Sequence, residues 1–136
     1  MLTVVSGPPC GGKSTFVREN AQPNDIIIDM DRIALALSHE SITNHDYPAH
    51  IRAVARSARE GARKKALEYA QGDRRINVWL IETSPSPANI EFYRILGARF
   101  VLQSPGLEEC LRRLKTRPLA NQLLVERVIR EYYANR

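Results

Sequence analysis

Short apolar runs alternate along the chain with longer stretches in which apolar residues recur every three or four positions. The runs predict four strands. The second is a β-branched run between turn residues, as expected for a strand buried on both faces of a parallel sheet. The predicted strands are Leu2 to Ser6, Asp25 to Asp29, Ile76 to Ile81 and Arg99 to Gln103.

The stretches between the runs predict helices, and several of their ends carry clear signals. Ser86 is a suitable N-cap with Pro87 at the first helical position, and Gly97 is a suitable stop. Pro118 breaks the helix that follows the fourth strand. The predicted helices cover about 11–20, 32–37, 49–71, 87–96, 105–117 and 121–133, with a loop at 38–48.

Strands that alternate with helices imply a mainly parallel sheet with helices on both faces. We therefore predict an α/β fold, a three-layer α/β/α sandwich of four to five strands, formed as one domain by residues 1–136. Ligands of such sheets bind at the carboxyl ends of the strands. Functional residues are therefore expected at 7–15, 29–32, 82–84 and after 103.

The segment after the first strand has the spacing of a phosphate-binding P-loop. It reads GPPCGGKS, which matches GxxxxGK[ST] in full at the opening of a helix. Glycines let backbone N–H groups turn toward phosphate oxygens, Lys13 neutralises the β and γ phosphates, and Ser14 ligates Mg²⁺. We therefore expect ATP, or another nucleoside triphosphate, with Mg²⁺. The expected contacts are Gly7, Pro8, Pro9, Cys10, Gly11, Gly12, Lys13, Ser14 and Thr15, with the Cys10 side chain pointing outward.

Two carboxylates, Asp29 and Asp31, follow the second strand at the same edge of the sheet. Transfer of a phosphoryl group to a hydroxyl needs a carboxylate that orients the hydroxyl and accepts its proton. Asp31 is the residue that we assign to this role. Asp29 is closer to the strand and is assigned to Mg²⁺ through water or to a turn cap. The alternative is that both aspartates only cap the following helix.

The charge of the chain is unevenly distributed. Lys and Arg number 20 against 15 Asp and Glu, which gives a net charge of +5. The excess lies in 52–75, where four arginines spaced 4, 3 and 4 apart form a stripe beside the predicted apolar face of a helix. The stripe fits a polyanionic partner, or alternatively a solvated face. The stripe consists of Arg52, Arg56, Arg59 and Arg63. The predicted apolar face of the same helix consists of Ile51, Val54, Ala55, Ala58, Ala62, Ala66 and Tyr69. The last helix is predicted to bury Leu124, Val128, Ile129 and Tyr132.

Other features exclude whole classes of protein. The longest apolar runs are far shorter than the ~18 to 20 residues of a membrane span. The N-terminus has no signal-peptide pattern, so we expect a cytoplasmic protein without a membrane partner. Two cysteines, Cys10 and Cys110, are too few for a disulfide framework, and we expect free thiols.

The chain resembles small P-loop kinases of the polynucleotide kinase and zeta-toxin type, an AAA-like group often encoded by phages. The resemblance rests on the segments GPPCGGKST, IIIDMDRI and ECLRRLKTRP, and more loosely on VERVIREYY. The resemblance implies that Asp31 activates the acceptor hydroxyl. It also implies a short lid near 112–121 in which Arg113 and Arg117 contact the ATP phosphates, a role that suits the planar guanidinium group. The alternative is that these cations only complement a helix C-terminus.

The chain departs from that family at two positions. Family members usually carry an arginine three residues beyond the catalytic aspartate, where this chain has Ala34. Acceptor contacts are therefore assigned to Arg32, Arg52, Arg56 and Arg59. The third strand ends in Glu82 instead of an aspartate, so Mg²⁺ is expected to depend on Ser14 and Asp29, with Glu82 acting through water.

These features together predict a kinase that transfers the γ-phosphoryl group of ATP to a hydroxyl. The favoured acceptor is the 5′-hydroxyl of a polynucleotide or a nucleotide. A small-metabolite or nucleoside kinase is one alternative. A regulatory module that hydrolyses the nucleotide slowly and transfers nothing is another, although such a module would not need the acidic pair.

Overall fold

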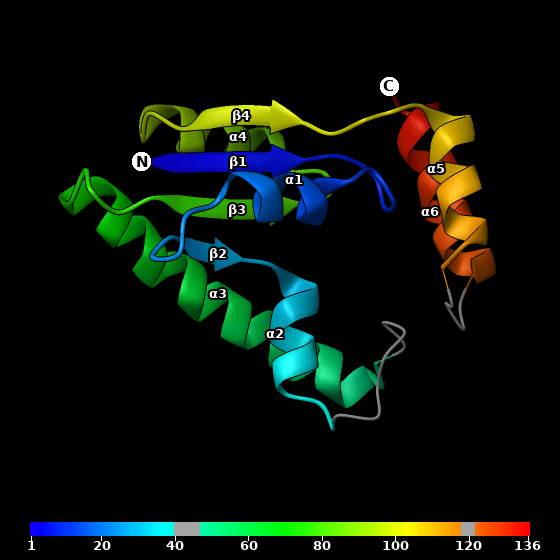
Figure 1. The fold of residues 1–136 in the computed structure, drawn as a ribbon, viewed down its shortest axis with the longest axis horizontal. Helices are drawn as coiled ribbons and strands as arrows, with labels where there is room; N and C mark the ends of the chain where they lie inside the picture. The colour runs from blue at the N-terminus through cyan, green and yellow to red at the C-terminus, as the bar shows by residue number, and fades with distance from the viewer. Residues whose placement is uncertain (40–46, 118–121) are drawn as a thin grey trace.

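The computed structural model describes residues 1–39, 47–117 and 122–136. Its strands form one fully parallel sheet in the order β2-β3-β1-β4 (Figure 1). The predicted α/β class and the four-stranded parallel sheet are confirmed. The elements are β1 (Leu2–Ser6), α1 (Lys13–Asn20), β2 (Ile26–Ile28), α2 (Met30–Ala36), α3 (Ala49–Gly72), β3 (Val78–Glu82), α4 (Pro87–Ile95), β4 (Arg99–Leu102), α5 (Leu107–Lys115) and α6 (Gln122–Ala134).

Four predictions lie wholly or partly outside the described residues: the loop at 38–48, the predicted lid near 112–121, the helix break at Pro118 and the start of the last helix at 121. In the part of the chain that is described, no helix has both the length and the apolar character that crossing a membrane requires. Cys10 and Cys110 are both free and buried.

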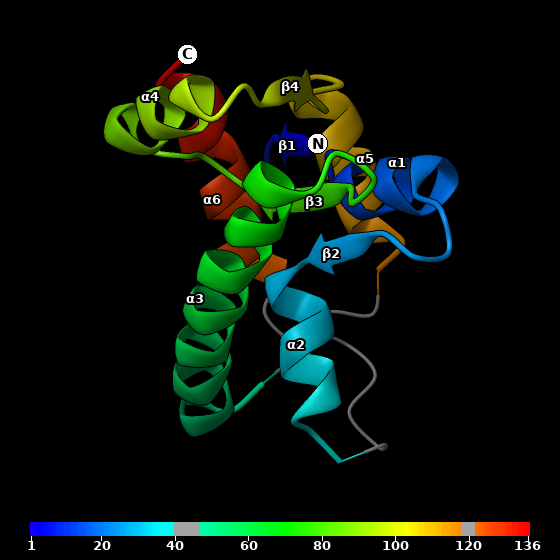
Figure 2. The ribbon, with the colours of Figure 1, turned by 90° about the vertical axis from the view of Figure 1, so that its left-hand side faces the viewer.

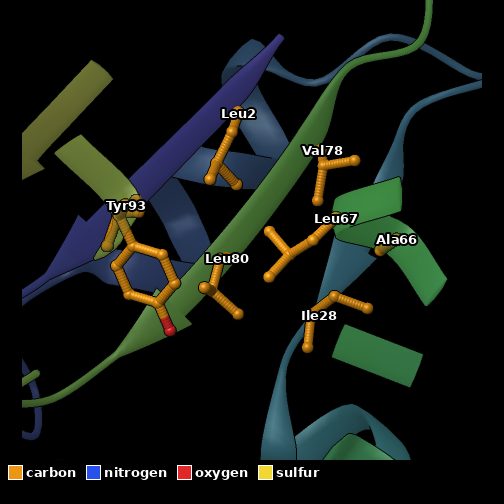
Figure 3. Packing of buried hydrophobic residues seen from close by; sticks show 8 residues of the cluster. Leu2, Ile28, Ala66, Leu67, Val78, Leu80 and Tyr93 are labelled. Atoms are coloured by element: carbon orange, nitrogen blue, oxygen red, sulfur yellow. The ribbon is translucent and has the colours of Figure 1, made fainter. Parts of the chain in front are cut away.

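The sheet has a separate apolar core on each face. Leu80 points to one face, where Leu67 of α3 and Tyr93 of α4 pack beside it (Figure 3), and Val4 of β1 belongs to the same cluster. Val5 points to the opposite face and packs with Val17 of α1. Each such side chain contributes about 1.5 to 3 kcal/mol when it is fully buried. The alternation along β1 therefore fixes α3 and α4 on one side of the sheet and α1 on the other, which completes the three layers (Figure 2).

The apolar face predicted for α3 is wrong in part. Ala55 and Ala66 are buried, but four predicted members of the face are exposed: Val54, Ala58, Ala62 and Tyr69. Three arginines of the stripe, Arg52, Arg59 and Arg63, are instead partly buried, whereas Arg56 is exposed. The N-terminal half of α3 continues past the sheet beside α2 (Figure 1). Near the middle of α3, the guanidinium group of Arg59 meets the polar end of β3 and donates to the Ile81 carbonyl and the Glu82 carboxylate.

Helices α5 and α6 pack against each other beside the P-loop. Cys110 and Leu114 of α5 and Ile129 of α6 form a buried cluster that also contains Cys10 of the loop. Ile129 and Tyr132 are buried as predicted, but Leu124 and Val128 are exposed. The prediction fails at these two positions because α6 packs against α5 on one side only, which leaves its opposite side in solvent.

Candidate functional site

The ends of β1, β2 and β3 meet at one cavity of about 540 Å³. This is the sheet edge at which the sequence predicts the functional residues. The P-loop from Pro9 to Thr15 lines the cavity, as do Asp29 and Asp31 after β2 and Glu82 at the end of β3. Gly7 and Pro8 are not part of this lining and are themselves buried. We call this space the phosphate cavity.

The backbone of the P-loop has three residues with positive φ. They are Gly7 at 148°, Cys10 at 62° and Gly12 at 93°. This geometry turns successive N–H groups toward one side, as in an anion-binding nest. Cys10 is the only described residue other than glycine with a positive φ, a conformation that costs a non-glycine residue about 1 kcal/mol or more. Its side chain is buried against α5 and α6 and does not point outward as expected.

The loop lies directly against the end of β4. The Gln103 amide donates to the Ser6 carbonyl at 2.8 Å. A Cβ added at Gly11 would lie 2.5 Å from the Gln103 carbonyl oxygen, and one added at Gly7 would overlap the same oxygen. Sequence analysis missed Gln103, because a glutamine that follows a strand carries no signal of its own.

We therefore expect Gly7→Ala to lower the free energy of unfolding by about 2 to 4 kcal/mol, since the new methyl group meets backbone that cannot move aside. Gly61→Ala is the matched control, because that helical glycine has open space around its Cβ position. The control should gain about 0.5 to 1 kcal/mol. Urea unfolding of both variants measures the difference, and equal stability of the two would contradict the described contact.

Lys13 is half-buried and folded back onto its own loop. Its Nζ donates to the carbonyl oxygens of Gly7 at 2.7 Å and Pro8 at 2.8 Å. Burial lowers the pKa of Lys13 to about 8, and the nearby carboxylates of Asp31 and Asp29 oppose that shift. The ammonium group is therefore held at the mouth of the nest and close to both aspartates.

Asp29 is almost completely buried and acts as the N-cap of α2. Its Oδ1 accepts from the Asp31 amide at 3.1 Å, and its Oδ2 accepts from the Ser14 hydroxyl at 3.2 Å. One carboxylate therefore joins the start of α1 to the start of α2. Asp31 lies two residues further on, in the first turn of α2, and lines the cavity.

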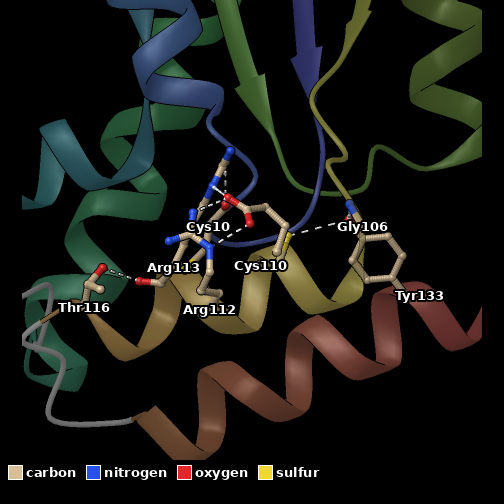
Figure 4. Close-up of polar contacts among 8 residues, drawn as sticks. Cys10, Gly106, Cys110, Arg112, Arg113, Thr116 and Tyr133 are labelled. Atoms are coloured by element: carbon tan, nitrogen blue, oxygen red, sulfur yellow. Dashed lines mark hydrogen bonds and ion pairs between the residues drawn. The ribbon is translucent and has the colours of Figure 1, made fainter.

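The predicted arginines separate into two groups. Arg56 and Arg117 line the phosphate cavity, and neither side chain makes a hydrogen bond or ion pair with any described residue. Arg113 is directed at the P-loop, where its Nη1 donates to the Cys10 carbonyl at 3.3 Å (Figure 4). Arg112, its neighbour, and Arg113 both pair with Glu109. Arg113 differs from Arg112 in its additional contact with the P-loop.

The other arginines make contacts within the protein. Arg59 donates to Glu82 Oε1 at 3.2 Å, and the Tyr93 hydroxyl donates to the same oxygen at 2.7 Å. Burial raises the pKa of Tyr93 to about 12, and the hydrogen bond and negative charge of Glu82 add to that rise. Arg52 donates to the Tyr47 carbonyl at 2.9 Å. Sequence analysis missed the role of Tyr93, although a buried tyrosine normally needs a partner for its hydroxyl.

Among the described residues, no group of three or more His, Cys, Asp or Glu side chains is arranged to hold a metal ion by itself. Ser14 and Asp29 are nevertheless in contact at the mouth of the nest. Glu82 lines the same cavity, but its carboxylate already accepts from Arg59 and Tyr93.

Comparison with known proteins gives a match in structure only. No family model matches the chain, and no curated protein matches its sequence. A solved structure of the Pnkp1/Rnl/Hen1 RNA repair complex has a similar fold, with a TM-score of 0.62 and 17% sequence identity. The match covers 98% of this chain and 44% of that chain. The chain therefore spans less than half of that neighbour and has the fold of a P-loop NTPase-like sandwich.

Proposed function

We propose that this protein is a kinase that transfers the γ-phosphoryl group of ATP, or another nucleoside triphosphate, to a hydroxyl of a nucleotide or of a nucleic acid end. The observation that carries the proposal is that the P-loop lysine and the acidic pair after β2 face one cavity. Lys13 is close enough to Asp31 and Asp29 for both carboxylates to raise its pKa. A module that only binds nucleotide has no use for this arrangement.

The residues around the nest fit a triphosphate. Its N–H groups and the N-terminus of α1 suit phosphate oxygens. Lys13 would exchange the carbonyls of Gly7 and Pro8 for those oxygens. Arg56 and Arg117 line the cavity without a side-chain hydrogen bond or ion pair to any described residue, so two guanidinium groups are available to balance charge that develops during transfer. Arg113 also lies at the loop, where it donates to the Cys10 carbonyl and pairs with Glu109.

Ser14, Asp29 and Glu82 are oxygen donors of the kind that Mg²⁺ prefers. The Ser14–Asp29 contact is suited to the ion, with Asp29 acting directly or through water. Glu82 would act only through water, since Arg59 and Tyr93 hold its carboxylate. When bound, the ion would neutralise charge on the triphosphate.

Asp31 is the better candidate for the base. Asp29 uses one carboxylate oxygen to cap α2 and the other to accept from Ser14, so it is committed to structure and to the Mg²⁺ site. Asp31 in the first turn of α2 lines the cavity, which suits it to orient the acceptor hydroxyl and to accept its proton.

The acceptor class rests on two arguments. The net charge of +5 favours an anionic partner. The structural neighbour belongs to an RNA repair complex, which supports a nucleic acid end as the acceptor. The stripe on α3 supports it less than the sequence suggested, because Arg52 and Arg59 are engaged within the protein. Arg56 lines the cavity and has no partner for its side chain in the part of the chain that is described.

Transfer of labelled phosphate from ATP to a panel of acceptors tests the proposal. The panel contains 5′-hydroxyl DNA and RNA, nucleosides, nucleoside 3′-monophosphates and sugars. We expect label on acceptors that carry a nucleoside and an anionic group. Label on sugars or free nucleosides alone would support the small-metabolite kinase instead. Release of inorganic phosphate with no labelled acceptor would contradict the proposal.

The lowered pKa of Lys13 predicts a pH dependence of nucleotide affinity. A phosphate tail binds the protonated lysine, so affinity for ATP should fall as the pH rises through about 8, by up to tenfold per pH unit. Burial raises the pKa of the Cys10 thiol, which opposes its ionisation. Calorimetric titrations between about pH 7 and pH 9.5 measure this effect.

Lys13→Arg is the control for this dependence, because a guanidinium group keeps its charge throughout that range. If the variant binds ATP at all, its affinity should vary much less above pH 8 than that of the parent protein. An ATP affinity of the parent protein that stays constant over the whole range would show that Lys13 does not titrate in the empty site.

A further inference from the structure

Four polar side chains from three elements meet at the end of β3. Glu82 is the last residue of the strand, Arg59 and Arg63 belong to α3, and Tyr93 belongs to α4. Tyr93 is fully buried, and the other three side chains are between 11% and 18% exposed. We call these four residues the Glu82 cluster. Hydrogen bonds in such a sheltered place compete little with water and hold their geometry.

The hydrogen bonds of the Glu82 cluster all lead to one carboxylate oxygen. Arg63 Nε donates to the Tyr93 hydroxyl oxygen at 3.1 Å, and that hydroxyl donates to Glu82 Oε1 at 2.7 Å. Arg59 donates to the same Oε1 at 3.2 Å. Since a guanidinium group only donates, the proton of the Tyr93 hydroxyl is directed to Glu82 and not to Arg63.

The two oxygens of the Glu82 carboxylate are used differently. Both hydrogen bonds reach Oε1, and no described residue donates to Oε2. Among the described residues, no side-chain oxygen or nitrogen is buried without a partner, so Oε2 is not enclosed in the core. Glu82 lines the phosphate cavity, which is the open space beside it. A cluster that only satisfied buried polar groups would not need to leave this oxygen open.

A glutamate at the end of β3 needs more support than an aspartate would. Its side chain has one more rotatable bond, and each bond that is immobilised costs conformational entropy. The ring of Tyr93 packs beside Leu80 in the apolar core, which holds its hydroxyl in place (Figure 3). Two donors from α3 and α4 on one oxygen therefore hold the longer side chain in one orientation before any ligand binds.

We propose that Tyr93, held by Arg63, is a positioning residue for phosphoryl transfer that acts through Glu82. Its hydroxyl fixes Oε1, so that Oε2 is presented to the phosphate cavity at a constant position. There Oε2 is suited to accept a hydrogen bond from a water molecule on Mg²⁺. The inference rests on the proposed kinase function, and it assigns a role in that function to two residues that do not line the cavity, Tyr93 and Arg63.

Tyr93→Phe tests the proposal, because it removes the hydroxyl and keeps the ring in the core. We expect kcat to fall about tenfold and the Mg²⁺ concentration that gives half the maximal rate to rise about fivefold. KM for ATP at saturating Mg²⁺ should stay unchanged. Steady-state transfer over a series of Mg²⁺ concentrations measures these values. Tyr69→Phe is the matched control, since Tyr69 is an exposed tyrosine of α3, and it should change none of them.

Glu82→Gln separates a positioning role from a structural one. Its amide can still accept from Arg59 and Tyr93, but it no longer presents a carboxylate oxygen to the cavity. If Tyr93 acts through Glu82, adding Tyr93→Phe to Glu82→Gln should lower kcat by less than about twofold. A full tenfold further loss in the double variant would show that Tyr93 does not act through Glu82 and would overturn the proposal. So would an unchanged kcat and Mg²⁺ dependence in Tyr93→Phe alone, with the kinase proposal left standing.

Calorimetric titration with ATP, with and without Mg²⁺, tests the Glu82 cluster independently of transfer. The gain in ATP affinity on adding Mg²⁺ should be about fivefold smaller in Tyr93→Phe than in the parent protein and in Tyr69→Phe. Arg63→Leu removes the donor to the Tyr93 hydroxyl and should reduce the gain in the same direction, including where Tyr93→Phe fails to fold.

Absence of transfer by the parent protein would count against the kinase proposal, and the calorimetric difference would then still support the role of the Glu82 cluster. An equal effect of Mg²⁺ on ATP affinity in the parent protein and in both cluster variants, or no effect in any of them, would overturn the proposal.

Discussion

Replacing Lys13 with alanine is expected to abolish measurable phosphoryl transfer, with a loss of about 10³-fold or more. The side chain is the cation at the mouth of the nest and close to both aspartates. The variant should still fold, because burial of this ammonium group is itself unfavourable, as its lowered pKa indicates. The measurement is labelled-phosphate transfer together with thermal unfolding.

Lys65→Ala is the control for that variant. Lys65 is an exposed lysine of α3 that pairs with Glu68 and lies far from the P-loop along the chain. Its replacement by alanine removes one positive charge, as Lys13→Ala does. It should leave transfer unchanged. Undiminished transfer in Lys13→Ala would refute the assignment of residues 7 to 15 as the phosphate nest.

Replacing Asp31 with asparagine is expected to leave ATP affinity near that of the parent protein and to reduce transfer by about 10²- to 10⁴-fold. An amide can accept a hydrogen bond from the acceptor hydroxyl but cannot take its proton. The expected signature is therefore a loss of kcat with little change in KM for ATP. Single-turnover transfer and a separate ATP titration measure the two effects.

Asp29→Asn separates the two aspartates. An asparagine can still cap α2 through its side-chain oxygen. Its amide nitrogen then faces the Ser14 hydroxyl in place of the carboxylate oxygen that accepts from it. We expect a loss of stability of about 1 kcal/mol and a weaker dependence on Mg²⁺. Normal transfer in Asp31→Asn together with no transfer in Asp29→Asn would show that Asp29 is the base.

The strands and helices could be predicted because their signals are local. The β-branched run at Ile26 to Ile28, the Ser86 cap and the glycine-rich loop each determine a conformation within a few residues. Since parallel strands present their carboxyl ends at one edge, these elements also predicted which segments would surround the site.

The direction of the arginines on α3 could not be predicted in this way. Helical periodicity favoured Val54 and Tyr69 as inward positions, whereas Arg52 and Arg59 turn inward. Arg52 does so because the Tyr47 carbonyl, outside the helix, accepts its hydrogen bond, and Arg59 does so because the end of β3, far away in the sequence, provides the acceptors. The helical periodicity of apolar residues does not predict burial that depends on polar groups elsewhere in the fold.

The contact between the P-loop and α5 is a second case. Cys10 was expected to point outward, yet it packs with Cys110 and Leu114. That packing brings Arg113 to the Cys10 carbonyl and leaves Arg112 at the surface. Helical periodicity does not separate the two arginines, although the family resemblance named Arg113, and the docking of α5 places Arg113 against the loop.

The most direct test of the central claim is calorimetric titration of the protein with ATP and Mg²⁺, and in parallel with adenosine. If residues 7 to 15 form a nest for a triphosphate, ATP should bind saturably with one site per chain, and adenosine should bind far more weakly. No heat from ATP, or equal affinity for ATP and adenosine, would contradict the account.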